Sequence, residues 1–572
     1  MNHWWLVVPA LLLVVAVAMR RSRTQRLIQL RRSWGLPVDR PRRMEAMAAS
    51  HRARIAALAQ SRSLDERTWA DLNLDEVFAA IDRTSGTLGQ HALYHRLRTA
   101  PVADHLPAFE ALVSRFTVDG AARERAQMAL SALQDPHGYD VWWLARPEAV
   151  ARRRWYAIFP VLTATTIALA ALAPVWPPAF MALLGVLLLN VAVRYASDEH
   201  VNAIAQSFRQ CAPLIAACES LRFLEGDDID PLAAPLRTEV ASLARLKLIS
   251  RCTNGDPLML SVSTQPVVIA LFSDLVRAVY EYLNLALVLD GTGVYLGVRD
   301  LARGGPALVR AAAAAGEVDA AIGMASYRAT LGAWIQPEFA RADAVTAISD
   351  VRHPLIPDAI PNSVVLRPGH GALVTGSNMS GKSTFLRTVG VNAVLAQTLN
   401  TCLAREYRAP IFDIRSCIGR ADDLIAGKSY YLAEVEALLD LVRASDESHP
   451  HLFLLDELFR GTNAVERIAS GQAVLQQLIG NARGAKPHIV LAATHDSELV
   501  ELTSHAFDAY HFGDALGPEG LTFDHRIQHG PATTRNAIAL LALHGAPEGL
   551  LTQAIATAEM LDRQRGITLA RR

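Results

Sequence analysis

The chain has 572 residues, more than the roughly 250–300 at which single hydrophobic cores stop growing, so we expect several domains. Its 56 Lys and Arg residues balance its 56 Asp and Glu residues, which removes net charge as an argument for a nucleic-acid partner along the whole molecule. The five cysteines lack CxxC or Cys/His ligand spacing, which favours buried thiols in a reducing compartment and excludes a disulfide framework or zinc site.

The first element is an uncharged apolar run at residues 4–19, followed by Arg20, Arg21, Arg23 and Arg26. A helix of this length spans about 24 Å, slightly less than the hydrocarbon core of about 30 Å. A secretory signal peptide would carry its positive charges before the apolar run. We therefore expect residues 1–19 to form an N-terminal transmembrane anchor whose C-terminal side is cytoplasmic.

Residues 20–43 carry nine arginines and a single acid, Asp39. We interpret them as topology-setting charge at the cytoplasmic membrane face. Contact with anionic lipid or with nucleic-acid phosphates is the alternative. The domain expected after the anchor, residues 20–150, thus begins as a basic juxtamembrane segment and continues as a helical region.

Two further apolar runs, at residues 155–173 and 179–193, are separated by a proline-rich turn. Arginines precede the pair and Arg194 follows it, so both ends are expected on the cytoplasmic side. The pattern predicts a transmembrane helical hairpin at 155–194, and a buried hairpin of a soluble domain is the alternative.

A fourth apolar stretch, at residues 267–289, contains Asp274, Arg277 and Glu281. These charges favour a long core helix over a fourth membrane segment. It belongs to a helical region that we expect to extend from 195 to 345.

The most informative motif is Gly376-x4-Gly381-Lys382-Ser383, which follows an apolar run directly. Glycines let backbone N–H groups face phosphate, the lysine neutralises phosphate oxygens, and the serine ligates Mg²⁺ at the start of a helix near Thr384. A simple glycine turn is the alternative. The predicted nucleotide-binding residues here are Gly376, Ser377, Asn378, Met379, Ser380, Gly381, Lys382, Ser383 and Thr384.

Two later strands end in residues that suit ATP hydrolysis. The apolar run 451–455 leads to Asp456, a candidate Mg²⁺ ligand, and to Glu457, which would orient or deprotonate the attacking water. The run 488–494 ends in His495, which suits the γ-phosphate. Helical segments between the strands predict a parallel sheet with a shared nucleotide edge, and Glu457, His495 and Lys382 as catalytic residues.

These motifs, with residues 419–434, Gly461-Thr-Asn463 and Arg352-His-Pro354, together resemble the ATPase domain of the MutS family. The resemblance covers roughly residues 346–560. It implies an α/β P-loop NTPase domain of the ABC/MutS type at 346–572, with C-terminal dimerising helices after Gly545-Ala-Pro547. An all-α core and lever region with transmembrane helices would precede it. ATP and Mg²⁺ are the implied cofactors.

The resemblance also implies roles within a dimer. Ser429 matches the signature serine that reaches the γ-phosphate of the partner subunit, and Asp422 and Asp423 match supporting positions. Two departures stand out. Tyr430 and Tyr431 replace the usual Thr-Phe, and no counterpart of the adenine-stacking aromatic occurs near residues 360–365.

Upstream, residues 71–101 more weakly resemble the start of the family's helical core, and helical stretches near 196–225 and 264–289 would form its lever. The Phe-x-Glu wedge that classical members stack on a mispaired base is missing from the N-terminal region. The Phe223-Leu-Glu225 sequence lies in the wrong region, and we interpret it as core packing.

The sequence therefore predicts a membrane-anchored, MutS-like ATPase that acts as a homodimer and couples ATP hydrolysis to the binding of double-stranded DNA. The missing wedge argues against specific reading of mismatches. The expected location is the cell inner membrane, multi-pass through three transmembrane segments, with the ATPase domain cytoplasmic. The alternative is a membrane-tethered mechanical ATPase that acts on a protein or lipid partner. A transporter is disfavoured because the membrane segments are few and the LSGGQ signature is missing.

Overall fold

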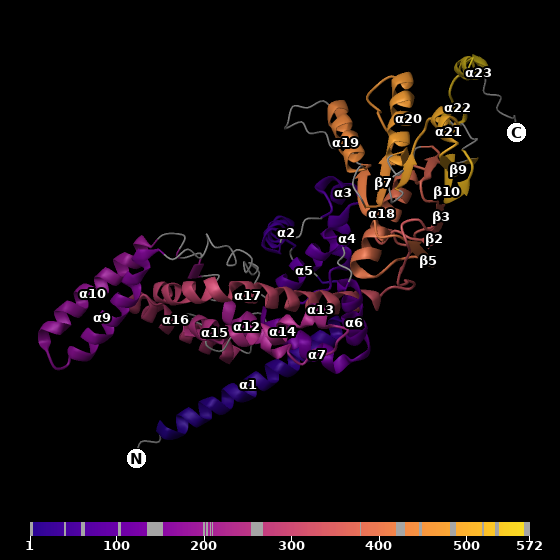
Figure 1. The fold of residues 1–572 in the computed structure, drawn as a ribbon. Coiled ribbons are helices and arrows are strands. Elements are labelled where there is room, and N and C mark those ends of the chain that lie inside the picture. Colours follow the sequence, from indigo (N-terminus) through magenta and orange to yellow (C-terminus); the bar gives the residue numbers. More distant parts are fainter. Residues whose placement is uncertain are drawn as a thin grey trace. The chain divides into compact units, whose positions relative to one another are not determined.

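A computed structural model describes residues 4–38, 40, 42–58, 63–100, 104–133, 153–197, 201, 204–205, 208, 210–252, 267–377, 379–418, 430–445, 449–480, 488–517, 520–531 and 537–564. The chain divides into two compact units. The first comprises Met1–Arg62, Ile81–Leu97 and Pro101–Leu331, and the second Ser63–Ala80, Arg98–Ala100 and Gly332–Arg572. The first unit is helical, and the second mixes helices with strands (Figure 1).

The first unit is built around α17, a helix of 40 residues with mostly small or apolar buried side chains. The central helix α17 comprises Leu289–Arg328. The other elements are α1 (Trp4–Ser33), α2 (Met44–Leu58), α5 (Thr87–Arg98), α6 (His105–Val118), α7 (Gly120–Leu130), η1 (Ser131–Leu133), η2 (Arg154–Ala157), α9 (Ile158–Leu172), α10 (Pro177–Ala196), α12 (Cys211–Ser220), α13 (Asp230–Ala233), α14 (Pro235–Thr238), η3 (Val240–Leu243), α15 (Ala244–Cys252) and α16 (Val267–Leu287).

A buried carboxylate fixes α5 against α17. Asp319 of α17 accepts the backbone N–H groups of Ser85 and Gly86 at 2.8 and 3.0 Å, so it satisfies donors at the start of α5. A Cβ at Gly89 would lie 2.0 Å from the Asp319 carboxylate, and this close approach explains the glycine. Burial raises the pKa of Asp319 to about 6.

A second polar cluster lies between α2, α5 and α17. Glu317, which is buried, forms ion pairs with Arg96 at 2.8 Å and with Arg54 at 3.4 Å. Beside these pairs, the Nδ1 atoms of His51 and His95 are 3.0 Å apart. Buried charges of this kind are tolerated when they are paired and hydrogen-bonded.

The predicted hairpin is present as α9 and α10, joined by a short turn before Pro177. By length and composition, two helical segments of the described chain qualify as membrane spans, Arg154–Leu172 and Pro177–Ala196. The expected third span at 4–19 is not supported. Those residues instead begin α1, which continues without a break through the arginines to Ser33.

The helix α16 confirms a helical segment at 267–289, and it does not qualify as a membrane span. Only some of the described side chains of α16 are buried, so it is not buried all round as a central core helix would be. Tyr280 and Asn284 are buried, whereas Leu275 and Tyr282 are 61% and 75% exposed.

The α16–α17 junction is a helix break held by the hairpin. Val288 adopts a left-handed conformation (φ 49°), so the preceding carbonyl groups lose their helical partners. Asn190 of α10 donates to Ala286 O at 2.5 Å, and Thr163 of α9 donates to Leu287 O at 2.5 Å. We call this set of contacts the hinge clamp. It joins both hairpin helices to the end of α16, directly before the break at Val288.

Two polar residues complete the junction. Asn284 accepts the backbone N–H of Asp290 at 2.9 Å and donates to its carboxylate at 2.7 Å. Arg194, after the apolar part of α10, contacts Glu281 at 3.1 Å and Asp290 at 3.6 Å.

The second unit contains a six-stranded sheet in the order β10-β9-β4-β8-β7-β6 and a four-stranded sheet in the order β1-β5-β2-β3. Strands β4, β7 and β8 are parallel and adjacent, which confirms the predicted parallel sheet. The strands are β1 (Glu338–Phe339), β2 (Thr346–Val351), β3 (Asn362–Leu366), β4 (Gly371–Thr375), β5 (Glu406–Ala409), β6 (Asp413–Cys417), β7 (His451–Asp456), β8 (Ile489–Ala493), β9 (Phe507–Gly517) and β10 (Gly520–His529).

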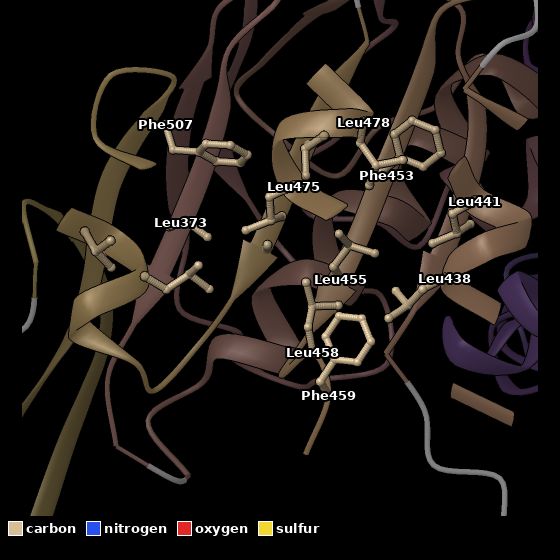
Figure 2. Close-up of a cluster of buried hydrophobic side chains, with 14 residues drawn as sticks. Leu373, Leu438, Leu441, Phe453, Leu455, Leu458, Phe459, Leu475, Leu478 and Phe507 are labelled. Atoms are coloured by element: carbon tan, nitrogen blue, oxygen red, sulfur yellow. The ribbon is translucent and has the colours of Figure 1, made fainter. Parts of the chain in front are cut away.

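The helices of this unit are α3 (Glu66–Asp71), α4 (Leu74–Ile81), α18 (Lys382–Leu399), α19 (Tyr430–Ala444), α20 (Ala464–Gly480), α21 (Ser497–Thr503), α22 (Ala537–Leu543) and α23 (Glu548–Gln564). Side chains of β7, β8, α19, α20 and α21 form a hydrophobic core on one face of the large sheet (Figure 2). Phe453, Leu455, Leu475 and Leu478 are completely buried there. This core fixes the strand ends that carry the functional residues.

The helix α3, far upstream in the sequence, covers the edge strand β6. The Asp71 carboxylate accepts the Ser416 hydroxyl at 2.7 Å and the Ile418 N–H at 2.8 Å. Thr68 Oγ1 accepts the Ser416 N–H at 3.0 Å. These contacts satisfy backbone donors that an edge strand would otherwise leave open.

Candidate functional site

The glycine-rich loop connects β4 to α18. Gly376 and Gly381 have φ angles of 144° and 114°, which side-chain-bearing residues rarely adopt. A Cβ at Gly376 would also lie 2.8 Å from Ser380 Oγ and 3.0 Å from Phe512 O. The helix begins at Lys382, two residues before the predicted start. Its unpaired N–H groups and positive dipole end make this loop a favourable anion site.

Lys382 is folded into the loop. Its Nζ donates to Gly376 O and Ser377 O, both at 2.9 Å, and lies 3.3 Å from His495 Nε2. Burial lowers the pKa of Lys382 to about 8, and the nearby Asp456 carboxylate opposes this shift. The lysine thus has no strong acidic partner in the loop, and phosphate oxygens would be better partners than the two carbonyl groups.

The loop serine and the strand carboxylate are hydrogen-bonded to each other. Ser383 Oγ donates to Asp456 Oδ2 at 2.5 Å. Burial raises the pKa of Asp456, although this hydrogen bond opposes the shift. The other oxygen, Oδ1, is buried and has no hydrogen-bond partner in the part of the chain that the structure describes. One hydroxyl and an orphaned carboxylate oxygen at a phosphate loop fit a magnesium ion, which prefers few protein ligands plus phosphate and water.

Glu457 and His495 are also brought together. Glu457 Oε1 lies 2.9 Å from His495 Nε2, and the carboxylate also contacts Arg460. The Glu457 backbone is left-handed (φ 52°), and its N–H donates to Ala493 O of β8 at 2.9 Å. Burial lowers the pKa of His495, and the charge of Lys382 lowers it further. His495 Nε2 therefore faces both the lysine and the Glu457 carboxylate.

A cavity of about 370 Å³ opens beside the loop. Its lining includes Lys382, Ser383, Thr384 and Glu457 of the predicted site. Ile356, Asp358, Ile360, Phe385, Phe512 and His525 are among the other residues that line it. Its size suits a nucleotide-sized ligand.

Sequence reasoning missed His525 and Asn362 of this cavity. His525 Nδ1 donates to Ser380 O at 3.0 Å, and Asn362 donates to His525 O at 3.0 Å. His525 lies in β10, where the pairing with β9 shifts register, and has a left-handed backbone (φ 51°). A lone histidine in a polar strand gives no signal in the sequence by itself.

Several predicted residues do not join this cluster. Asn378 and Ser429, as well as Asp422 and Asp423, lie outside the described residues. Met379 lines the cavity but is 86% exposed. Ser377 Oγ and Ser380 Oγ are buried without hydrogen-bond partners among the residues that are described. Asn463 accepts the Glu466 N–H at 3.0 Å, so it stabilises the start of α20.

Comparison with known proteins gives consistent matches to this region. Residues 372–562 match the family MutS domain V. The chain is 33% identical over 278 residues to the DNA mismatch repair protein MutS of Thermus aquaticus, which covers 48% of this chain and 33% of that protein. Proteins of the same description from Streptococcus uberis and Streptococcus suis are 36% identical over 249 residues and 38% over 210.

These two matches cover 41% and 36% of this chain and 28% and 24% of the respective proteins. The matched region thus spans a third or less of the length of these relatives.

Proposed function

We propose that this chain is a MutS-family ATPase that binds ATP in the cavity at the glycine-rich loop and hydrolyses it there, since residues 372–562 match MutS domain V. The observation that carries the proposal is the convergence of Ser383, Asp456, Glu457 and His495 around the buried Lys382. Phosphoryl transfer needs mainly positioning and charge stabilisation, and these residue types supply both.

Binding would rest on the loop from Gly376 to Thr384. Backbone N–H groups at the start of α18 would face the phosphates, and Lys382 would exchange the carbonyl oxygens of Gly376 and Ser377 for phosphate oxygens. A magnesium ion would be held by Ser383 and Asp456 and would supply charge neutralisation at the phosphates. The remaining part of the cavity, toward Ile360 and His525, would take the nucleoside.

Hydrolysis would use Glu457 to orient or deprotonate water, since its carboxylate lines the cavity near the start of α18. His495 contacts both Glu457 and Lys382, so it would hold the carboxylate in place and stay close to the γ-phosphate. Asn378 and Ser429 would complete the site, the latter from a partner subunit.

We further propose a homodimer. The C-terminal helices α22 and α23 pack on each other, and they leave Leu541, Leu550, Ile555 and Met560 44–50% exposed. Apolar side chains exposed along one helical hairpin fit association with a second copy. The domain division would be an N-terminal helical segment, the helical region, the hairpin, the lever region and the ATPase domain, with the bounds predicted from the sequence.

For the partner, we propose double-stranded DNA, since the matched relatives are named DNA mismatch repair proteins. A protein or lipid partner remains the second candidate. The exposed apolar surface of α9 and α10 supports a membrane location and a lipid partner. The arginines on both sides of the hairpin, such as Arg154 and Arg194, support a cytoplasmic ATPase domain at the inner membrane.

The catalytic proposal is tested with Glu457→Gln in the detergent-solubilised full chain. We expect ATP binding to stay within about threefold of wild type while turnover falls by at least about a hundredfold, because the carboxylate acts on the water and not on the nucleotide. The exposed Glu466→Gln change serves as the control. Undiminished hydrolysis in Glu457→Gln would falsify this role.

The partner proposal is tested by measuring ATPase rates with homoduplex DNA, with mismatched DNA and without DNA. Stimulation by both duplexes, with affinity that falls steeply as salt increases, supports phosphate contacts without mismatch specificity. Stimulation by mismatched DNA alone contradicts the predicted lack of mismatch specificity. Salt-insensitive association, or none, favours the protein or lipid alternative.

A further inference from the structure

The loop that carries Glu457 has an unusual backbone. Two of the residues that follow β7, Glu457 and Phe459, have left-handed φ angles of 52° and 57°. Residues with side chains adopt this conformation only when surrounding contacts enforce it. The contacts that hold this loop therefore determine where the Glu457 carboxylate lies.

Two hydrogen bonds hold the loop on opposite sides. The Glu457 N–H donates to Ala493 O of the neighbouring strand β8 at 2.9 Å. The Phe459 N–H donates to Oε1 of Glu434, a side chain of α19, at 2.6 Å. A bond from a backbone N–H to a carboxylate is stronger than one to a neutral acceptor.

Hydrophobic contacts hold α19, and with it Glu434, next to the loop that contains Phe459. Leu458 and Phe459 are buried in the same core cluster as Leu438 and Leu441 of α19, and Figure 2 shows Leu458 and Phe459 below Leu438. The helix α19 thus approaches the loop through one turn of apolar side chains and presents the Glu434 carboxylate to its backbone.

The surroundings of Glu434 are those of a functional carboxylate more than those of a surface residue. Its second oxygen, Oε2, is buried with no hydrogen-bond partner among the residues that the structure describes. Burial raises the pKa of Glu434, and the Phe459 hydrogen bond opposes this shift. A half-buried acid with an orphaned oxygen destabilises the fold slightly, which is expected where position matters for activity.

We propose that Glu434 is a positioning residue for ATP hydrolysis: its hydrogen bond to Phe459 fixes the left-handed loop and thereby the direction of the Glu457 carboxylate. This inference rests on the proposed ATPase activity. It also gives α19 a route to the hydrolytic carboxylate, since any shift of α19 moves the acceptor of the Phe459 amide.

The test compares Glu434→Ala, Glu434→Gln and the matched control Glu436→Ala, an exposed glutamate on the same helix, in the detergent-solubilised full chain. For Glu434→Ala we expect kcat to fall roughly tenfold or more with KM for ATP within about twofold, because only the orientation of Glu457 changes. Glu434→Gln keeps a carbonyl oxygen for the same N–H, so it should keep kcat within about threefold. Glu436→Ala should match wild type.

Hydrogen exchange of the Phe459 amide provides a readout that does not need turnover. Exchange should accelerate in Glu434→Ala and stay slow in Glu434→Gln and Glu436→Ala. Lost protection with unchanged kcat overturns the positioning role, and unchanged protection in Glu434→Ala overturns the contact. A fall of kcat in Glu436→Ala as large as that in Glu434→Ala also overturns the role. A wild-type chain that binds ATP without hydrolysing it overturns the proposed function itself, which the other failures leave standing.

Discussion

Lys382 is a buried cation whose partners are two carbonyl oxygens of its own loop. Its pKa, lowered from 10.5 to about 8, means that the free protein loses this charge as the pH rises through 8. Phosphate oxygens would stabilise the charged form and raise the pKa again. Nucleotide binding near pH 8 should therefore take up a proton, and ATP affinity should fall between pH 7 and pH 9.

Isothermal titration calorimetry of ATP binding in two buffers of different ionisation enthalpy measures this uptake. We expect uptake of up to about half a proton at pH 8 and almost none at pH 6.5, where the lysine is already charged. The measurement at pH 6.5 is the internal control. Equal binding enthalpies in both buffers at pH 8 would contradict the assigned role of the lysine.

Within the site, the sequence could predict that two residues lie close together only where both follow neighbouring parallel strands. Ser383, Asp456 and His495 lie together because β4, β7 and β8 are parallel neighbours whose carboxyl ends share one edge. Glu434 and His525 come from a helix and from a distant strand. Their placement depends on tertiary packing, so a spacing pattern gives no indication of it.

Among the elements, the hairpin and the hinge clamp form one connected structure. Asn190 is fully buried and also donates to Thr166 at 2.9 Å, besides the carbonyl of Ala286. Replacing it by leucine leaves that carbonyl without its donor. We expect Asn190→Leu to lower the free energy of unfolding of the first unit by about 1–3 kcal/mol, measured by thermal unfolding in detergent.

The adjacent Leu189 is 48% exposed and provides the control for this change. Leu189→Ala should change the unfolding temperature little, because no buried polar partner is lost. If Asn190→Leu is as stable as Leu189→Ala, the hinge clamp does not stabilise the junction.

The interface of α2, α5 and α17 predicts acid sensitivity of the first unit. Burial lowers the pKa of His91 to about 4 and lowers that of His95, which also faces Arg54, His51 and Arg96. Because the folded state keeps these rings neutral, the unfolded chain binds more protons at them below pH 6.5. Asp319, whose pKa is raised to about 6, opposes one ring between pH 6 and pH 4, but the two rings together still make stability fall toward pH 4. Each ring contributes up to about 1.4 kcal/mol per pH unit in this window.

Thermal unfolding measured from pH 7 to pH 4.5 tests this expectation. His91→Leu should make the stability of the first unit less dependent on pH, since it removes one of the titrating rings. The leucine side chain carries no charge at any pH. His449→Leu, in the second unit and half-buried, is the control and should leave the slope for the first unit unchanged. A profile that is flat for the wild type would contradict the neutral state of the buried rings.

The elements that could be predicted from the sequence are those whose hydrophobicity differs clearly from that of the flanking residues. The hairpin was predictable because two uncharged runs flank a proline turn. The 40-residue helix α17 was not, because its buried surface is made of alanine and glycine and Pro306 lies within it. Small residues give little hydrophobic periodicity, so a helix that is buried on most sides by alanine and glycine has only a weak helical pattern in the sequence.

At the scale of the whole molecule, the hairpin should hold the chain in a membrane. Val161 of α9 and Leu188 of α10 are 61% and 73% exposed. Placing a charge at such a position in a bilayer costs roughly 2.5–3.5 kcal/mol. We expect the wild type to stay in the membrane fraction after an alkaline carbonate wash, and Val161→Asp combined with Leu188→Asp to be released.

The control variant has its new charge at a position outside the hairpin. Val118 is 87% exposed at the end of α6, and Val118→Asp should leave the fractionation unchanged. Release of the wild type by carbonate would show that the hairpin does not span the bilayer. The arginines of α1 would then be the remaining basis for membrane contact.

The assignment of chain segments to the two compact units was the least predictable feature. Residues 71–101 were expected to begin one helical core, yet Ser63–Ala80 and Arg98–Ala100 belong to the second unit and Ile81–Leu97 to the first. Neither composition nor a turn signal marks these exchanges. They follow from side chains such as Asp71 and Thr68, whose partners lie more than 340 positions later.

That covering of β6 has a practical consequence for anyone who expresses the ATPase part alone. A recombinant fragment starting at residue 332 would contain the whole stretch matched by the family, but it would lack α3. Its outermost strand would then offer unpaired amides to another copy, and we expect precipitation on purification. Joining residues 63–80 to the fragment through a flexible linker should keep it soluble. The two stretches belong to one compact unit, so we expect the ATPase part to need both of them although a long segment of chain separates them.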